Sequence, residues 1–139
     1  MKNKAPLSLM EQLVMLLVFA LAAVLCLQVY VLSGQVSRHC EVRNQAVTLV
    51  QNTAESVKAS RGDASQYPRL LGGSGDADRW CICYDEDWKQ TAPETSCYRL
   101  LICAEDTGLP TLGRASVSAM TESGEPLFSV AVAWQEVAP

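Results

Sequence analysis

A long apolar run near the N-terminus constrains the fold of this chain more than any other feature. No charged residue occurs between Glu11 and Arg38, and residues 13–31, LVMLLVFALAAVLCLQVYV, contain one strongly polar side chain, Gln28, and neither Pro nor Gly. A helix needs about 20 apolar residues to cross the hydrocarbon core of a bilayer. A single crossing must be helical, because lipid offers no partner to free backbone groups. The run therefore predicts one transmembrane helix, over residues 7–33.

The charges that flank the run predict its orientation in the membrane. Lys2 and Lys4 precede it with no acid between them, whereas basic and acidic side chains alternate beyond it. The cytoplasmic flanks of membrane spans are enriched in Lys and Arg. We therefore expect residues 1–6 to form a short cytoplasmic leader, and the residues beyond the span to lie outside the cytoplasm of a bacterial cell.

The length of the run also predicts that the anchor is retained. The apolar core of a removable signal peptide is about 7–15 residues long and is followed by a small-residue cleavage site, and this run is longer. Residues 32–34 resemble the start of a lipoprotein cleavage site, but Gln35 stands where the lipidated Cys is required. We expect a single-pass protein of the cell membrane.

A helical pattern continues beyond the predicted span. Apolar residues recur at the three-, four- and seven-residue spacing of an amphipathic helix, namely at Val36, Cys40, Val47, Val50, Ala54 and Val57. Gly62 is a stop signal, since glycine readily adopts the left-handed conformation that ends many helices. Residues 34–61 are therefore predicted to continue the membrane helix, in a rod of about 80 Å at about 1.5 Å per residue.

Beyond the helix, the apolar pattern changes to the two-residue period of strands. Glycines and a proline in residues 62–79 indicate a loop, with one short helix near residues 64–71. Four strands are predicted, over residues 80–84, 97–104, 113–121 and 127–135, with a hairpin turn at 122–125. Short connections favour an antiparallel meander, and its apolar face needs a cover. We therefore predict an α+β fold, in which the long helix packs on a small antiparallel sheet in a head over residues 62–139.

Glu11 has two competing interpretations, because a carboxylate at the edge of an apolar helix is costly unless it is paired or near headgroups. Ser8-Leu9-Met10-Glu11 matches the S-x-x-E capping box, with Ser8 as the cap and Glu11 near the positive end of the helix dipole. Alternatively, Glu11 pairs with a positive group of another subunit when helices bundle in the membrane.

Residues 7–14, LSLMEQLV, resemble the start of a mature type IV pilin or type II secretion pseudopilin. In that family an apolar residue and a small hydroxyl residue, here Leu7 and Ser8, precede two apolar residues and a Glu that neutralises a neighbouring subunit's N-terminal amine. The resemblance implies that Glu11, Leu7 and Ser8 form an assembly site. It further implies a non-enzymatic subunit of a pilus, secretion or DNA-uptake apparatus, with other pilin-like subunits and assembly platform proteins as partners.

One position departs from the pattern of that family. Pro6 stands where the family's leader ends in Gly, after which a prepilin peptidase cuts and the new amine is methylated. Proline has a fixed φ angle and no amide hydrogen. We interpret the chain as an uncleaved relative or a minor subunit.

Five of the six cysteines lie beyond the apolar run, and Cys26 lies within it as a small apolar residue. In the predicted strands, Cys81 and Cys83 share one sheet face, as do Cys97 and Cys103. Three interpretations stay open: plain thiols, a disulfide that joins the 81/83 pair to residue 97 or 103, and a four-thiolate zinc site, for which the C-x-C spacing is poor. The candidate site is the disulfide, and no metal or other cofactor is expected.

Other functional classes find little support in the sequence. The residues after Arg38 are mildly acidic and contain no run of Lys or Arg, so no nucleic-acid contact is expected. His39 is the only histidine and no nucleophile, base and orienting group occur together, so we expect neither an enzyme nor a small-molecule substrate. Two alternatives remain: calcium held by the acidic residues within 76–87, and a stand-alone membrane-tethered binding or sensory module.

Overall fold

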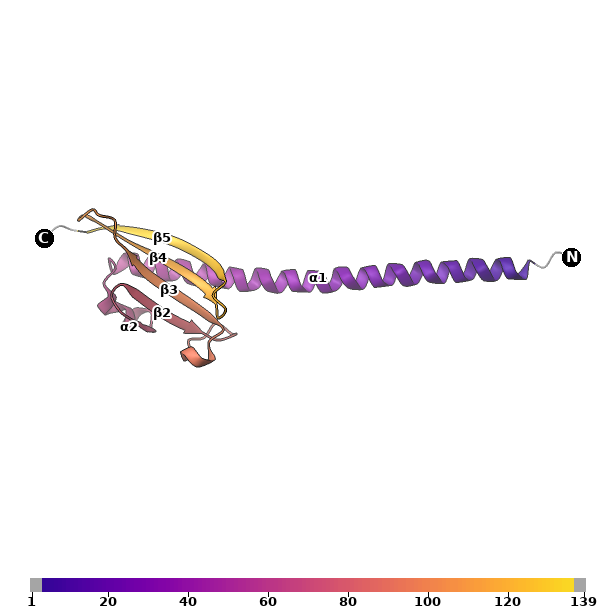
Figure 1. Ribbon diagram of the computed structural model, residues 1–139, viewed down its shortest axis with the longest axis horizontal. Helices are drawn as coiled ribbons and strands as arrows, with labels where there is room; N and C mark the ends of the chain where they lie inside the picture. The colour runs from indigo at the N-terminus through magenta and orange to yellow at the C-terminus, as the bar shows by residue number, and fades with distance from the viewer. Residues whose placement is uncertain (1–3, 137–139) are drawn as a thin grey trace. The chain divides into compact units, whose positions relative to one another are not determined.

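The computed structural model describes residues 4–136, and the predictions for residues 1–3 and 137–139 lie outside the described residues. The chain divides into two compact units, one up to Glu41 and one from Val42 onwards. One long N-terminal helix is followed by a small antiparallel sheet (Figure 1). The predicted α+β fold of pilin-like architecture is therefore confirmed.

Helix α1 spans Ala5–Ala59 and begins earlier than a capping box at Ser8 requires. The amide of Ser8 donates to the carbonyl oxygen of Lys4 at 3.2 Å, which places Ser8 inside the helix. Pro6 fits the first turn, where a missing amide hydrogen leaves no helical bond unmade. The first turn contains no acidic residue, so the capping-box interpretation of Glu11 is wrong.

In the first unit, every described residue of α1 is exposed. Leu7 and Phe19 are each 74% exposed, although the mean hydropathy of the most apolar 18-residue window of the helix is 2.7. Within residues 4–136, α1 is the one helix long and apolar enough to cross a membrane. A helix with this surface calls for a cover of lipid or of other helices, because water solvates such side chains poorly.

The second unit contains a five-stranded sheet with the order β1-β2-β3-β4-β5, in which all neighbours are antiparallel. Its strands are β1 (Ser74–Gly75), β2 (Arg79–Tyr84), β3 (Tyr98–Glu105), β4 (Leu112–Thr121) and β5 (Pro126–Gln135). The four predicted strands and their meander are confirmed, and β1 is an addition of two residues in a glycine-rich stretch without an alternating pattern. The short helices are η1 (Ala64–Gln66) and α2 (Tyr67–Leu70), predicted as one helix near 64–71, and η2 (Pro93–Thr95) between β2 and β3.

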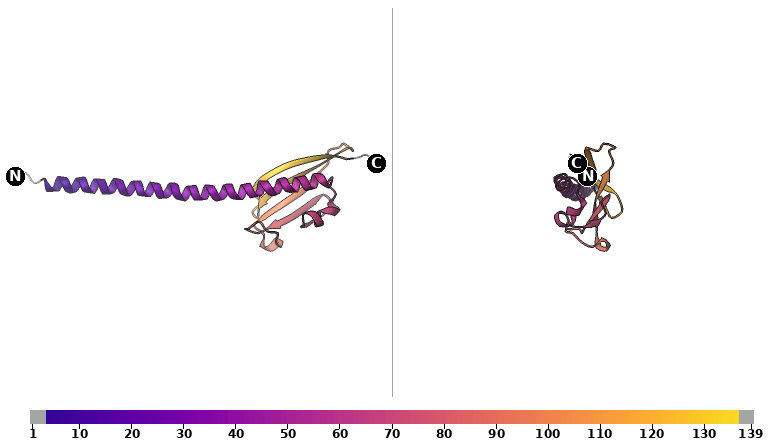
Figure 2. Two further views of the ribbon diagram at one scale, coloured as in Figure 1. Left: turned by 180° about the vertical axis from the view of Figure 1, so that it is seen from behind. Right: turned by 90° about the vertical axis from the view of Figure 1, so that its left-hand side faces the viewer.

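The last turns of α1 cover one face of the sheet, as Figures 1 and 2 show. The sheet contributes Ile82, Leu100 and Val117, each at most 1% exposed, and α1 contributes Val50 and Val57, both fully buried. Residues of the helix, α2 and the strands form one core cluster. The second unit therefore has its own hydrophobic core.

The stripe predicted on the helix is confirmed in part. Val50, Ala54 and Val57 are buried, but Val47 is only half-buried, and the predicted Val36 and Cys40 lie exposed in the first unit. The centre of the buried stripe runs instead through residues that the pattern missed, Ala46 and Thr53. A period of 3.6 residues fits both stripes, so only packing against the sheet decides between them.

Helix α1 ends in a Schellman motif. The amide of Gly62 donates to the carbonyl oxygen of Val57 at 2.9 Å, and the amide of Arg61 donates to that of Lys58 at 3.1 Å. Arg61 has a φ of 52° and occupies the left-handed position that glycine usually takes, and Gly62 follows with a φ of 72°. The helix thus stops close to the predicted signal, with Arg61 rather than Gly62 at the position that ends it.

Candidate functional site

The three predicted assembly residues lie on one face of α1. Leu7, Ser8 and Glu11 are separated by one, three and four residues, so they project from adjoining turns. Together with Lys4 they border one shallow depression in the helix surface. We call Lys4, Leu7, Ser8 and Glu11 the assembly face, and all four residues are exposed.

Lys4 was not among the residues predicted for this face. It precedes Glu11 by seven residues, which is about two helical turns and about 10.5 Å along the axis. That spacing is visible in the sequence, but the start of α1 at Ala5 had to be known before Lys4, the residue just before the helix, could be grouped with Glu11. Within residues 4–136, the structure has no salt bridge to Glu11. The assembly face therefore carries one negative and one positive group that are not paired with each other.

Two cysteines of the head, Cys81 and Cys83, lie on the sheet face opposite the core. Along β2, buried Trp80, Ile82 and Tyr84 alternate with half-buried Cys81 and Cys83, whose sulfur atoms are 4.0 Å apart. All six cysteines lie among the described residues and all are free.

The partners predicted for a disulfide lie on or beside β3. Cys103 stands opposite Arg79 on β2, and Cys97 precedes β3, where its amide donates to the Tyr84 carbonyl oxygen at 2.9 Å. The residues directly opposite Cys81 and Cys83 are therefore not cysteines. A disulfide from the 81/83 pair to residue 97 or 103 stays a prediction.

Electrostatics keep at least two of these thiols protonated at neutral pH. Burial raises the pKa of Cys81 above its ordinary value and the adjacent Cys83 raises it further, whereas the guanidinium groups of Arg99 and Arg79 oppose the rise. Desolvation likewise raises the pKa of Cys97, and the nearby carboxylates add to the effect. A thiol with a raised pKa is a poor nucleophile at neutral pH.

The acidic residues considered for calcium do not converge. Asp76 and Asp78 precede β2, whereas Asp85, Glu86 and Asp87 follow it. The strand therefore separates the two groups by about 20 Å. Asp85 serves its own turn, because its carboxylate accepts the amides of Asp87 and Lys89, each at 2.9 Å. Within residues 4–136, no group of three or more His, Cys, Asp or Glu side chains is arranged to hold a metal ion.

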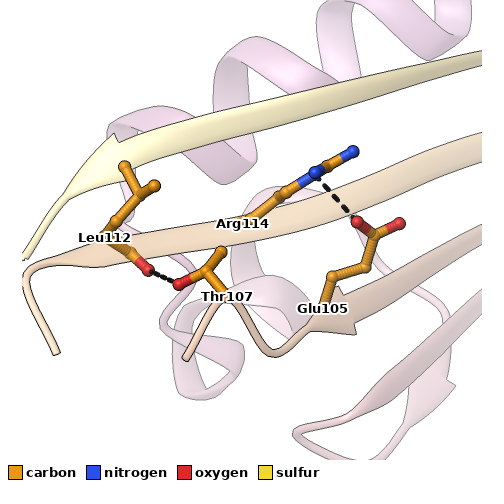
Figure 3. Close-up of polar contacts among 4 residues, drawn as sticks. All are labelled: Glu105, Thr107, Leu112 and Arg114. Carbon is orange, nitrogen blue, oxygen red and sulfur yellow. Dashed lines mark hydrogen bonds and ion pairs between the residues drawn. The ribbon is translucent and has the colours of Figure 1, made fainter. Parts of the chain in front are cut away.

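A shallow depression of about 550 Å³ lies beside the loop between β3 and β4. Figure 3 shows two contacts beside it: Arg114 Nε donates to Glu105 Oε2 at 2.8 Å, and the Thr107 hydroxyl donates to the Leu112 carbonyl oxygen at 2.7 Å. The ion-paired side chains are 50% and 38% exposed, and such surface pairs contribute little because water screens them. Both contacts link the β3 side of the loop to β4.

No family model, curated protein or solved structure matches this chain.

A second residue that the sequence pattern missed is Arg99. Strand pairing places it directly opposite Cys83, and its Nε atom is buried without a hydrogen-bond partner in the described part of the chain. No motif in the sequence connects residue 99 with residue 83. Their proximity follows only from the register between β2 and β3.

Proposed function

We propose that the chain is a pilin-like subunit of the minor pseudopilin kind, anchored in a bacterial membrane by the apolar part of α1, with its head outside the cytoplasm. It acts, without catalysis, in a type IV pilus, type II secretion or DNA-uptake-like assembly. The observation that carries the proposal is Glu11, an exposed carboxylate on an apolar helix with no salt-bridge partner within residues 4–136.

The energetic cost of Glu11 supports a partner from another subunit. A carboxylate at the centre of a membrane helix costs about 2.5–3.5 kcal/mol, less toward the helix ends, and intramembrane ionisable groups usually face other protein. Capping offers no alternative, since Ser8 lies inside the helix. A positive group from a neighbouring helix neutralises the carboxylate, and the attraction is stronger in a low-dielectric layer than in water.

Lys4 supplies the positive group that the proposal requires. When two parallel copies of α1 lie side by side with an axial displacement of two turns, about 10.5 Å, Lys4 of one copy is level with Glu11 of the other. Both residues border the same depression, so both point toward such a neighbour. The pair does not depend on cleavage at Pro6, because the amine belongs to a side chain.

The head supports the same role. The part of α1 from Ala46 to Val57 is committed to the core of the sheet, whereas the apolar part up to Glu41 has no protein cover in the described chain. The first unit is thus free to bundle with the helices of other pilin-like subunits and assembly platform proteins. The head then determines contacts outside the membrane.

Crosslinking in the native membrane tests the proposal. A variant that keeps Cys26 and has the other five cysteines changed to Ser is coexpressed with candidate assembly proteins and treated with a bifunctional maleimide. We expect crosslinked species that contain Cys26, and we expect Glu11→Gln to remove at least about nine tenths of them, since loss of a pair worth about 1.4 kcal/mol weakens association tenfold.

Glu41→Gln is the matched control, because Glu41 is also an exposed acid on α1 but lies outside the apolar run. It should leave the crosslinks unchanged. The exchange Lys4→Glu with Glu11→Lys keeps the net charge of the N-terminal segment and should restore crosslinks that either single change removes. If Glu11→Gln has no effect and the chain stays monomeric, it is a stand-alone tethered module instead.

A further inference from the structure

The β2 strand places two sulfur atoms together on the open face of the sheet. Cys81 and Cys83 are both half-buried, and their Sγ atoms are 4.0 Å apart. We propose that Cys81 and Cys83 form a two-thiolate binding site for a soft monovalent metal ion, copper(I) being the biological example. Soft thiolate ligands select copper(I) over hard cations.

The separation of the sulfur atoms suits a shared metal ion better than a disulfide. Two metal–thiolate bonds of about 2.3 Å each span up to about 4.6 Å, which exceeds the 4.0 Å between these atoms. A disulfide between the same residues requires the sulfur atoms to approach to about 2.05 Å. Same-face neighbours along a strand have Cα atoms about 6.6 Å apart, which is at the upper limit for a disulfide.

The number of available ligands selects the ion. Structural zinc takes four ligands, and within residues 4–136 no third His, Cys, Asp or Glu joins Cys81 and Cys83 in a metal-binding group. Copper(I) is stable with two thiolates. The C-x-C spacing that is poor for zinc is therefore adequate for copper(I).

Arg99 supplies the charge that such a complex needs. Two thiolates and one copper(I) ion carry a net charge of −1, and Arg99 lies directly across the strand pair from Cys83. The Arg99 Nε atom is buried and lacks a hydrogen-bond partner in the described part of the chain. An unpaired buried donor is costly, and a negatively charged thiolate beside it offers the missing acceptor.

Binding proceeds without a change in oxidation state. Two thiols and one copper(I) ion give a copper bis-thiolate and release two protons, as metal ions do when they bind Cys. No oxidant or reductant takes part.

The test uses the full-length protein in detergent, reduced and free of oxygen, with copper(I) offered as its bicinchoninate complex. We expect transfer of one copper(I) per chain, measured by loss of the colour of the complex. Cys81→Ser and Cys83→Ser should each abolish the transfer, whereas Cys97→Ser and Cys103→Ser should retain it. Arg99→Gln should keep the stoichiometry and weaken binding about 10-fold, in the range found for residues that support metal ligands, and Arg99→Lys should recover part of the affinity.

A stability measurement guards against misfolded variants. Copper(I) should raise the Tm of the wild-type head and leave that of Cys81→Ala and Cys83→Ala unchanged, because only a ligand that binds the native state stabilises it. The proposal is overturned if reduced protein takes up no copper(I), if both serine variants keep the uptake, or if protein isolated from membranes without reductant carries Cys81 or Cys83 in a disulfide. The site is independent of assembly, so Glu11→Gln should leave copper uptake unchanged.

Discussion

At the scale of single residues, two side chains hold a backbone conformation that glycine adopts more easily. Arg61 and Trp88 are the non-glycine residues with positive φ within residues 4–136, at 52° and 60°. Trp88 is held by packing, since its ring stacks on Tyr98 with ring centroids 4.2 Å apart and planes 3° from parallel. Arg61 holds its conformation where α1 must end. The core therefore offsets the strain at Trp88, while the strain at Arg61 can be relieved by substitution.

Arg61→Gly is expected to stabilise the head by about 0.5–1 kcal/mol. Relief of the left-handed conformation adds about 1–2 kcal/mol to the free energy of unfolding. The greater conformational freedom of glycine in the unfolded chain lowers it by about 0.5–1 kcal/mol. Denaturant unfolding of the full-length protein in detergent measures the change through tryptophan fluorescence, because all three tryptophans lie in the second unit. Arg61→Ala is the control and should change stability by less than about 0.5 kcal/mol. Equal stability of the two variants would show that Arg61 is not strained.

At the scale of elements, β5 packs against the turn that ends α1 through the side chain of Trp134. The Trp134 indole covers both Gly62 and Gly113, and a Cβ atom at either glycine would collide with the ring. Both positions require glycine for space, and the φ of 72° at Gly62 favours glycine for its conformation as well. The half-buried indole packs the last strand against the turn that ends the helix. Its Nε1 atom is buried and has no hydrogen-bond partner among the described residues.

The position of the buried stripe on α1 gives a prediction at the same scale. Val50→Ala should lower the free energy of unfolding of the head by about 2 kcal/mol, because Val50 is fully buried against the sheet and its removed methyl groups leave a cavity. Val47→Ala, at a half-buried position, should cost less than about 1 kcal/mol, and Val36→Ala in the exposed first unit should cost nothing measurable. Denaturant unfolding followed by tryptophan fluorescence compares the three. Equal losses in the free energy of unfolding for Val47→Ala and Val50→Ala would contradict the structure. They would show that Val47 is buried as deeply as Val50, as the sequence pattern predicts.

At the scale of the whole molecule, buried phenols link the stability of the head to pH. Tyr67 on α2, Tyr84 on β2 and Tyr98 on β3 all have a pKa raised above the ordinary value of 10.0, in each case mainly because burial disfavours the phenolate. The native head therefore keeps protons that the unfolded chain releases. Stability from these groups is complete below about pH 10 and falls as the pH rises further, since the unfolded state then binds fewer protons.

Tyr67→Phe should make the alkaline loss of stability shallower. Phenylalanine has no hydroxyl group to ionise, so the contribution of Tyr67 to the fall above about pH 10 disappears. The free energy of unfolding measured between about pH 9 and 11 should thus decline less steeply in the variant than in the wild type. Tyr30→Phe is the control, because Tyr30 lies exposed on α1 in the first unit. An unchanged slope for Tyr67→Phe would mean that the residue is not buried as the structure has it.

Much of this architecture could be predicted from local patterns. The absence of charge after Glu11 indicates a helix suited to lipid, and the change from a helical to a two-residue period marks the start of the sheet. The meander follows because its connections are short. These features depend on residues close in sequence, and the physical preferences of such residues act before any tertiary contact forms. Leu7, Ser8 and Glu11 share a face for the same reason.

Other features were decided only by the tertiary structure. Packing against the sheet selected Ala46 and Thr53 over Val47, because a helical period leaves the centre of a stripe free to rotate by one residue. Register placed Arg99 opposite Cys83, and a slip of one residue would have sent either side chain to the other face. Contacts between residues distant in sequence have no local signal, so the chain specifies them only when its strands and helix come together.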